Sequence, residues 1–322
     1  MLAINAANAR LWSILGSRGT FGVAMLDAAA DADDLMLLTA DLAITSGLER
    51  FRNTYPDKFL NVGIAEQNMI GIAAGFAKEG FNTFATTFAT FAAMRAYETV
   101  RVHLGYMQRN VKVIGLASGL AMGQFGNTHY GIEDAALMRA VPGLTVIAPA
   151  DGAEIVKTVY ALMHHEGPVY VRLTGAMNNP MVYKDDYDFK IGKAVHLREG
   201  SDVAIFATGT MVHESLVAAS SLSKQGISAS VTNIHTLKPL DTDAVDKACA
   251  GARLLVTVEE HSTIGGLAGA IAEYTAQRGG APRQMPIGLP DSFVKNGDYK
   301  YLLQKHGLTG SQIAEKIAAR LE

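Results

Sequence analysis

Short apolar runs of strand length alternate with helical segments along most of this chain of 322 residues. Strands that alternate with helices predict a largely parallel sheet with helices on both faces. In the first half, strands are expected at 35–39, 82–86, 111–117, 145–150 and 168–173. Helices are expected at 5–31, 64–79, 91–104, 132–141 and 152–165.

A second set of alternating segments follows a polar, irregular stretch at 176–191. Strands are expected at 202–207, 227–233 and 253–258, and helices at 212–224, 242–249, 264–278 and 311–321. We therefore predict an α/β protein with two domains, 1–175 and 192–322, joined by a linker at 176–191.

Composition excludes several classes of protein. The net charge is −3 and no Lys/Arg cluster stands out, which argues against nucleic-acid binding. No apolar run is long enough to span a membrane, and the amphipathic first 19 residues do not resemble a signal peptide. Cys249 is the only cysteine, so no intrachain disulfide is expected. A cytoplasmic globular enzyme fits these features.

The stretch 59–90 carries the strongest chemical signal. A strand-like FLNVG leads into a helix that places Glu66 in its first turn, and Gly80 is expected to end that helix. A carboxylate at this position is commonly only a favourable partner of the helix dipole. The helix is nevertheless rich in small residues, such as Gly71 and Gly75, that permit close approach of another backbone.

The segments NVGIAEQN (61–68) and TFATF (87–91) resemble the pyrimidine-binding domain of thiamine diphosphate enzymes of the transketolase family. The resemblance implies that Glu66 hydrogen-bonds N1′ of the aminopyrimidine and acts as a catalytic residue. It also implies that Phe88 and Phe91 pack on that ring, although plain core aromatics would look the same in sequence. Met94 stands where the family usually has a further aromatic residue. Asp41, which follows a strand at its carboxyl end, is a further cofactor-side candidate.

The glycine-rich loop 119–131 ends in GNTH (126–129), which aligns with the family's GPTH motif. A histidine in such a loop can face a cleft and exchange protons near neutral pH. The resemblance implies that His129 contacts the substrate's hydroxyl and carbonyl oxygens, as a second catalytic residue.

Four residues are candidates for binding an anionic substrate. Arg172, in YVRL, aligns with a family arginine that binds the substrate phosphate, and Arg95, in RAYE, resembles the RAYD arginine of deoxyxylulose-phosphate synthases. A guanidinium suits such an oxyanion because it can bind it bidentately. Arg18 and Ser46 are weaker candidates for the same pocket.

Two positions depart from the typical transketolase pattern. Phe125 replaces an aspartate that reads the sugar's C2 hydroxyl, and Ala117 replaces a phosphate-binding histidine. A large apolar ring in place of a hydroxyl reader should change selectivity at that carbon. The usual sugar phosphates are therefore not assumed as substrates.

The resemblance covers nearly the whole chain, since VTVEEHSTIGGLAGAIAE (256–273) resembles the family's C-terminal domain. The family's Gly-Asp-Gly motif for diphosphate and metal has no match, because Gly297-Asp298 is followed by tyrosine. The expectation is one half of a split transketolase. A partner subunit would bind the diphosphate and Mg²⁺ (or Ca²⁺ or Mn²⁺), in a heterotetramer with two copies of each subunit.

The predicted function is transfer of a two-carbon ketol unit from an anionic ketose, such as a sugar phosphate, to an aldehyde, with the partner subunit present. Two alternatives remain open. The chain could belong to a decarboxylating enzyme, similar to deoxyxylulose-phosphate synthase or a 2-oxoacid dehydrogenase beta subunit. It could instead be a non-catalytic partner that scaffolds or regulates its companion.

Overall fold

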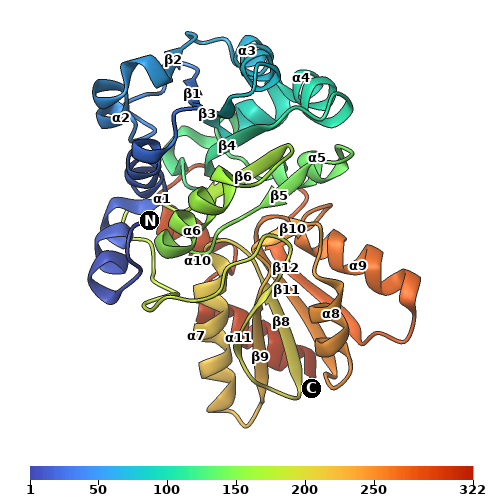
Figure 1. The fold of residues 1–322 in the computed structure, drawn as a ribbon. Helices are drawn as coiled ribbons and strands as arrows, with labels where there is room; N and C mark the ends of the chain where they lie inside the picture. The colour runs from blue at the N-terminus through green and yellow to red at the C-terminus, as the bar shows by residue number, and fades with distance from the viewer. Residues whose placement is uncertain (322) are drawn as a thin grey trace.

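The computed structural model describes residues 1–321, which form an N-terminal and a C-terminal lobe, each built on its own sheet (Figure 1). Both sheets are mainly parallel and carry helices on both faces. The predicted α/β class is therefore confirmed.

The sheet of the N-terminal lobe has seven strands in the order β10-β5-β6-β4-β3-β1-β2. Their bounds are β1 Leu35–Thr39, β2 Phe59–Asn61, β3 Asn82–Phe88, β4 Val111–Ser118, β5 Thr145–Ile147, β6 Val169–Thr174 and β10 Thr236–Lys238. The α-helices are α1 Ala6–Ala28, α2 Glu49–Thr54, α3 Glu66–Lys78, α4 Tyr97–Thr99, α5 Asp134–Ala140 and α6 Gly152–Met163.

The apolar side chains of β1 point alternately to the two faces of the sheet, which explains why helices cover both faces. Leu35 and Leu37 join the core under α1 and α6, whereas Met36 and Leu38 join the core under α3 and α5. Because successive side chains of a strand point to opposite faces, an all-apolar strand needs a helical layer on each side.

The sheet of the C-terminal lobe has five strands in the order β12-β11-β8-β9-β7. Their bounds are β7 Val195–Arg198, β8 Val203–Ala207, β9 Ala229–Asn233, β11 Leu254–Ser262 and β12 Arg283–Leu289. The helices are α7 Met211–Ser223, α8 Thr242–Cys249, α9 Leu267–Arg278, α10 Tyr299–Lys305 and α11 Gly310–Leu321.

Several details differ from the sequence-based expectations. β10 lies beyond the predicted linker, yet it pairs antiparallel with β5 and so completes the first sheet. The helix expected at 91–104 is wound irregularly, as π-helical turns at Phe91–Arg95 and Val100–Tyr106 on either side of α4. The glycine-rich loop 119–131 contains a 3-10 turn at Gly123–Thr128.

The parallel pairing of β1, β2, β3 and β4 brings their carboxyl ends to one edge of the sheet. Open α/β sheets bind ligands at this edge. The connections that meet there are residues 40–48, 62–65, 89–90 and 119–131. Over residues 1–321, no helix combines the length and the apolar character that crossing a membrane requires.

Candidate functional site

Glu66 is the first residue of α3, and its side chain is only 3% exposed. No side chain caps this helix, so the carboxylate in its first turn is the negative group near the positive end of the helix dipole. Oε1 accepts a hydrogen bond of 2.8 Å from Nη1 of Arg95. Within residues 1–321, no hydrogen bond reaches Oε2, which leaves one acceptor oxygen available.

Two aromatic rings pack next to the ion pair of Glu66 and Arg95. The guanidinium of Arg95 lies 4.2 Å from the ring centroid of Phe91, so it is both paired with Glu66 and stacked on a ring. Phe91 in turn packs edge-on against Phe88, with ring centroids 5.9 Å apart. Arg95 is half exposed, at 49%, whereas Phe88 is buried.

His129 joins this group from the loop that follows β4. Its ring lies 5.4 Å from that of Phe91 and 5.9 Å from that of Phe88. The ring of Phe125 lies 5.1 Å from that of His129, and Phe125 is 65% exposed. Nδ1 of His129 shares a hydrogen bond of 2.9 Å with the Thr128 hydroxyl.

Asn61 ties the connection after β1 to the one that leads into α3, a link that the sequence did not indicate. Its amide donates to Asp41, at 3.0 Å, and its Oδ1 accepts from the backbone N–H groups of Asp41 and Gly63. Asp41 adopts a φ of 59° and is exposed. Met94 is also exposed, and its sulfur contacts the Thr90 hydroxyl.

Arg172 lies in β6 with its side chain only 1% exposed, and its guanidinium has internal partners. Nε donates to both carboxylate oxygens of Asp134, at 2.9 and 3.0 Å, and Nη2 donates to the carbonyls of Gly131 and Glu260. Arg172 thus forms a buried ion pair with Asp134 and hydrogen bonds to two backbone carbonyls. The phosphate contact that the resemblance implies for Arg172 stays a prediction.

The two weaker anion candidates lie near a different hollow. Arg18 lines a cavity of about 180 Å³ with residues 44–45, 47 and 175–177, and burial lowers the pKa of its guanidinium. Ser46 is fully buried, and its hydroxyl has no hydrogen-bond partner among the described residues. No hydrogen bond or ion pair within residues 1–321 joins either side chain to Glu66.

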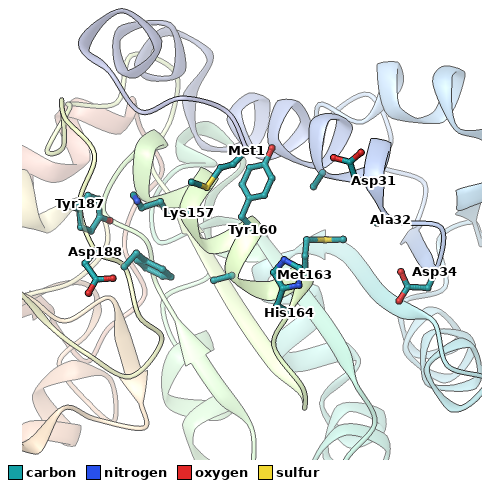
Figure 2. A pocket seen from close by; sticks show the side chains of 13 residues that line it. Met1, Asp31, Ala32, Asp34, Lys157, Tyr160, Met163, His164, Tyr187 and Asp188 are labelled. Carbon is teal, nitrogen blue, oxygen red and sulfur yellow. The ribbon is translucent and has the colours of Figure 1, made fainter.

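A larger cavity of about 720 Å³ lies between the end of α1, α6 and the linker (Figure 2). None of the predicted site residues lines it. Two of its polar groups are paired, since Lys157 binds Asp186 and the Tyr160 hydroxyl donates to Asp27. We assign no function to this cavity.

The structure thus connects Glu66, Arg95, Phe91, Phe88, His129 and Phe125 by an unbroken row of contacts at the carboxyl edge of the sheet. These residues come from three separate segments, α3, the β3–π-helix junction and the loop after β4. Within the described part of the chain, no group of three or more His, Cys, Asp or Glu side chains is arranged to hold a metal ion.

Comparisons with known proteins identify the family of both lobes. Residues 15–178 match the family model described as the transketolase pyrimidine binding domain, and residues 192–313 match the transketolase C-terminal domain. A 6-deoxy-6-sulfo-D-fructose transketolase subunit of a Clostridium species is 40% identical over 298 residues, 92% of this chain and 91% of that protein.

Two further relatives cover the same length. An apulose-4-phosphate transketolase subunit from Phocaeicola vulgatus is 36% identical over 92% of this chain and 94% of its own. A solved structure described as a split gene transketolase, an inactive beta4 tetramer, superimposes with a TM-score of 0.86 at 36% identity, over 94% of this chain and 97% of that one. The chain therefore belongs to the transketolase family and contains its pyrimidine-binding and C-terminal domains.

Proposed function

We propose that this chain is the C-terminal subunit of a two-subunit transketolase and that it binds the aminopyrimidine end of thiamine diphosphate. The observation that carries the proposal is the row of contacts that runs from Glu66 to His129. It puts a buried carboxylate, a stacking ring and a proton-exchanging imidazole at one edge of the sheet.

The residues present suit this cofactor. The Arg95 guanidinium is a flat group that donates a hydrogen bond to Glu66 while it stacks on Phe91. An aminopyrimidine is also flat, so the same ring can stack on it, and a proton held between its N1′ and the carboxyl group of Glu66 would join the two by a hydrogen bond. When bound, thiamine diphosphate supplies the carbanion stabilisation of the reaction.

The chain's own residues then have distinct tasks. Glu66 holds the pyrimidine nitrogen N1′ and exchanges a proton with it, which a carboxylate in a buried site can do. Phe88 and Phe91 exclude water and fix the plane of the ring. His129 uses Nε2 to give or take a proton at a substrate oxygen, since its Nδ1 is engaged by Thr128. Asp41 and Met94 border the cofactor side.

The substrate side favours an anionic ketose. Arg95 is half exposed, so it can leave Glu66 and bind an oxyanion when the cofactor takes its place. Phe125 presents an apolar ring beside His129, where a hydroxyl-reading side chain is absent. Two relatives are named for a sulfonated and a phosphorylated sugar. Ketol transfer from such a sugar to an aldehyde is the reaction we propose.

A separate subunit is proposed to supply the diphosphate and Mg²⁺ site. Two relatives are named as transketolase subunits, and the solved split transketolase is described as an inactive beta4 tetramer. Gly71 and Gly75 of α3 face open space, since nothing lies within 4 Å of a Cβ added at either position. That surface can receive another chain closely, which supports an assembly with two copies of each subunit.

The reaction is tested with the chain and its partner subunit combined, with thiamine diphosphate and Mg²⁺ present. We expect transfer of a two-carbon unit from a phosphorylated or sulfonated ketose, and no release of carbon dioxide from pyruvate. An Arg95→Gln variant should raise KM for the anionic ketose about tenfold or more, because a charged hydrogen bond is lost, and change KM for the unphosphorylated sugar little. Equal KM changes for both sugars would mean that Arg95 does not bind the anionic group of the substrate.

The decarboxylating reaction is the second candidate, because the Arg95 that contacts Glu66 lies in a segment similar to that of deoxyxylulose-phosphate synthases. Pyruvate consumption with release of carbon dioxide, in the same assay, would decide for it and against ketol transfer.

A further inference from the structure

The loop 119–131, which carries Phe125 and His129, is held from two sides. At its base, the N–H of Gly119 donates to the carbonyl of Gly131 at 2.7 Å, and Arg172 donates to that same carbonyl. Its outer part also meets the C-terminal lobe, through hydrogen bonds with residues 294–297. The position of His129 therefore depends on residues far away in the sequence.

Glu260, at the carboxyl end of β11, is the buried centre of this contact, with its side chain 1% exposed. Oε1 accepts a hydrogen bond of 2.7 Å from the backbone N–H of Leu120 in the loop. Oε2 accepts from the hydroxyls of Thr210 and Tyr299, at 2.8 and 2.7 Å. Burial raises the pKa of Glu260, while these hydrogen bonds and nearby Arg172 oppose the shift.

Two loop glycines allow the lobes to approach this closely. A Cβ at Gly119, where φ is 70°, would lie 2.3 Å from Oε1 of Glu260. A Cβ at Gly123 would lie 2.5 Å from the carbonyl oxygen of Gly297. Neither distance is possible for a real side chain, so the sequence of the loop is adapted to the C-terminal lobe.

The segment between β12 and α10 makes the remaining contacts. The amide of Asn127 donates to the carbonyl of Val294 at 2.9 Å, and the amide of Asn296 donates to that of Gln124 at 3.3 Å. The N–H of Gly297 donates to the carbonyl of Gly123 at 3.2 Å. The loop is thus clamped on both sides of Phe125.

We propose that Glu260 is a positioning residue through which the C-terminal lobe holds the loop 119–131, and with it His129 and Phe125, against Phe88 and Phe91. This gives the C-terminal lobe a role in the site, although the row of contacts includes none of its residues. The catalytic consequence rests on the proposed function, whereas the positioning itself does not.

Hydrogen exchange of the folded chain, followed by mass spectrometry, tests the positioning. A Glu260→Ala variant should exchange about tenfold or more faster in peptides that cover 119–131, since a charged hydrogen bond to the loop is lost. Glu260→Gln keeps an acceptor for Leu120 and should restore most of the protection. Unchanged exchange in Glu260→Ala would overturn the proposal.

Glu259→Ala is the matched control. Glu259 is the preceding residue of β11 and equally buried, but its oxygens accept from the N–H groups of Leu267 and Ala268 at the start of α9. Its loss should raise exchange at 267–270 and leave 119–131 protected. Equal loosening of the loop by both variants would mean general destabilisation and would contradict a specific role for Glu260.

A double variant, Asn127→Ala with Asn296→Ala, keeps the proposal testable if Glu260→Ala fails to fold. It removes two contacts made by side chains outside the core, and it should raise exchange in 119–131 alone. With the partner subunit, it should lower kcat about tenfold and leave the affinity for thiamine diphosphate unchanged. The double variant could exchange faster in 119–131 while the wild-type chain with its partner subunit fails to bind thiamine diphosphate. That result would uphold the role of the C-terminal lobe in holding the loop and refute the proposed function. Unchanged exchange would refute the clamp.

Discussion

A Glu66→Gln variant is expected to fold as stably as the wild-type chain and to lower kcat of the assembled enzyme by about 10²- to 10⁴-fold, the usual contribution of a proton-transferring side chain. Glutamine has the same shape and can still accept from Arg95. It cannot exchange a proton with the pyrimidine nitrogen. Stability should change little, because Arg95 is half exposed and such ion pairs contribute little.

Glu79→Gln is the control for this experiment, because it removes a carboxylate just past the other end of the same helix, where the side chain is exposed. It should leave both kcat and the melting temperature near their wild-type values. If Glu66→Gln retained wild-type kcat in the assembled enzyme, Glu66 would have no catalytic role, and the scaffold alternative would gain support.

Arg172→Met is expected to lower the free energy of unfolding by about 3–5 kcal/mol, which is the usual cost of removing one partner of a buried ion pair. Asp134 is fully buried and would keep only the hydroxyl of Tyr170, which donates to it at 2.7 Å. Burial and the Asp134 carboxylate raise the pKa of Tyr170 well above its ordinary value, so that hydroxyl remains a donor. Urea unfolding, monitored by circular dichroism, measures the loss.

Two further variants separate the ion pair from simple packing. Replacing both partners, Arg172→Met with Asp134→Leu, should recover much of the stability, because no unpaired charge then remains buried. Glu273→Gln breaks the partly exposed pair with Arg139 and should cost less than about 1 kcal/mol. A small effect of Arg172→Met alone would contradict a structural role for the ion pair and would favour the predicted role of Arg172 as a phosphate ligand.

Much of the fold could be predicted because long apolar runs leave few choices for a strand. The runs at 35–39 and 111–117 are buried on both faces, and the continuous apolar pattern of such segments is visible in the sequence. β12 is not among the predicted strands. Its segment contains Pro286, which weakens a strand pattern, but this strand lies at the sheet edge, where proline is tolerated. β10 has only three residues and is defined by its pairing with β5, which no local pattern reveals.

The site was predictable only in part, for a similar reason. Motifs identified Glu66, Phe91 and His129 as candidates, and the structure places them in one row. The pairing of Glu66 with Arg95 spans 29 positions, and the contact of Glu260 with Leu120 spans 140. The first contact depends on how α3 packs against the π-helical turn at Phe91–Arg95, and the second on how the two lobes pack. For Arg172, the alignment suggested a phosphate ligand, but no motif indicated its ion pair with Asp134.

The central claim is that this chain supplies one half of a thiamine diphosphate site and a partner subunit the other. The most direct test is calorimetric titration of thiamine diphosphate with Mg²⁺ into the purified chain, into the proposed partner subunit, and into the two combined. The account predicts tight binding only when the two subunits are combined, and it predicts that Glu66→Ala strongly weakens this binding. Equally tight binding by this chain alone, or by the combined subunits with Glu66→Ala, would contradict it.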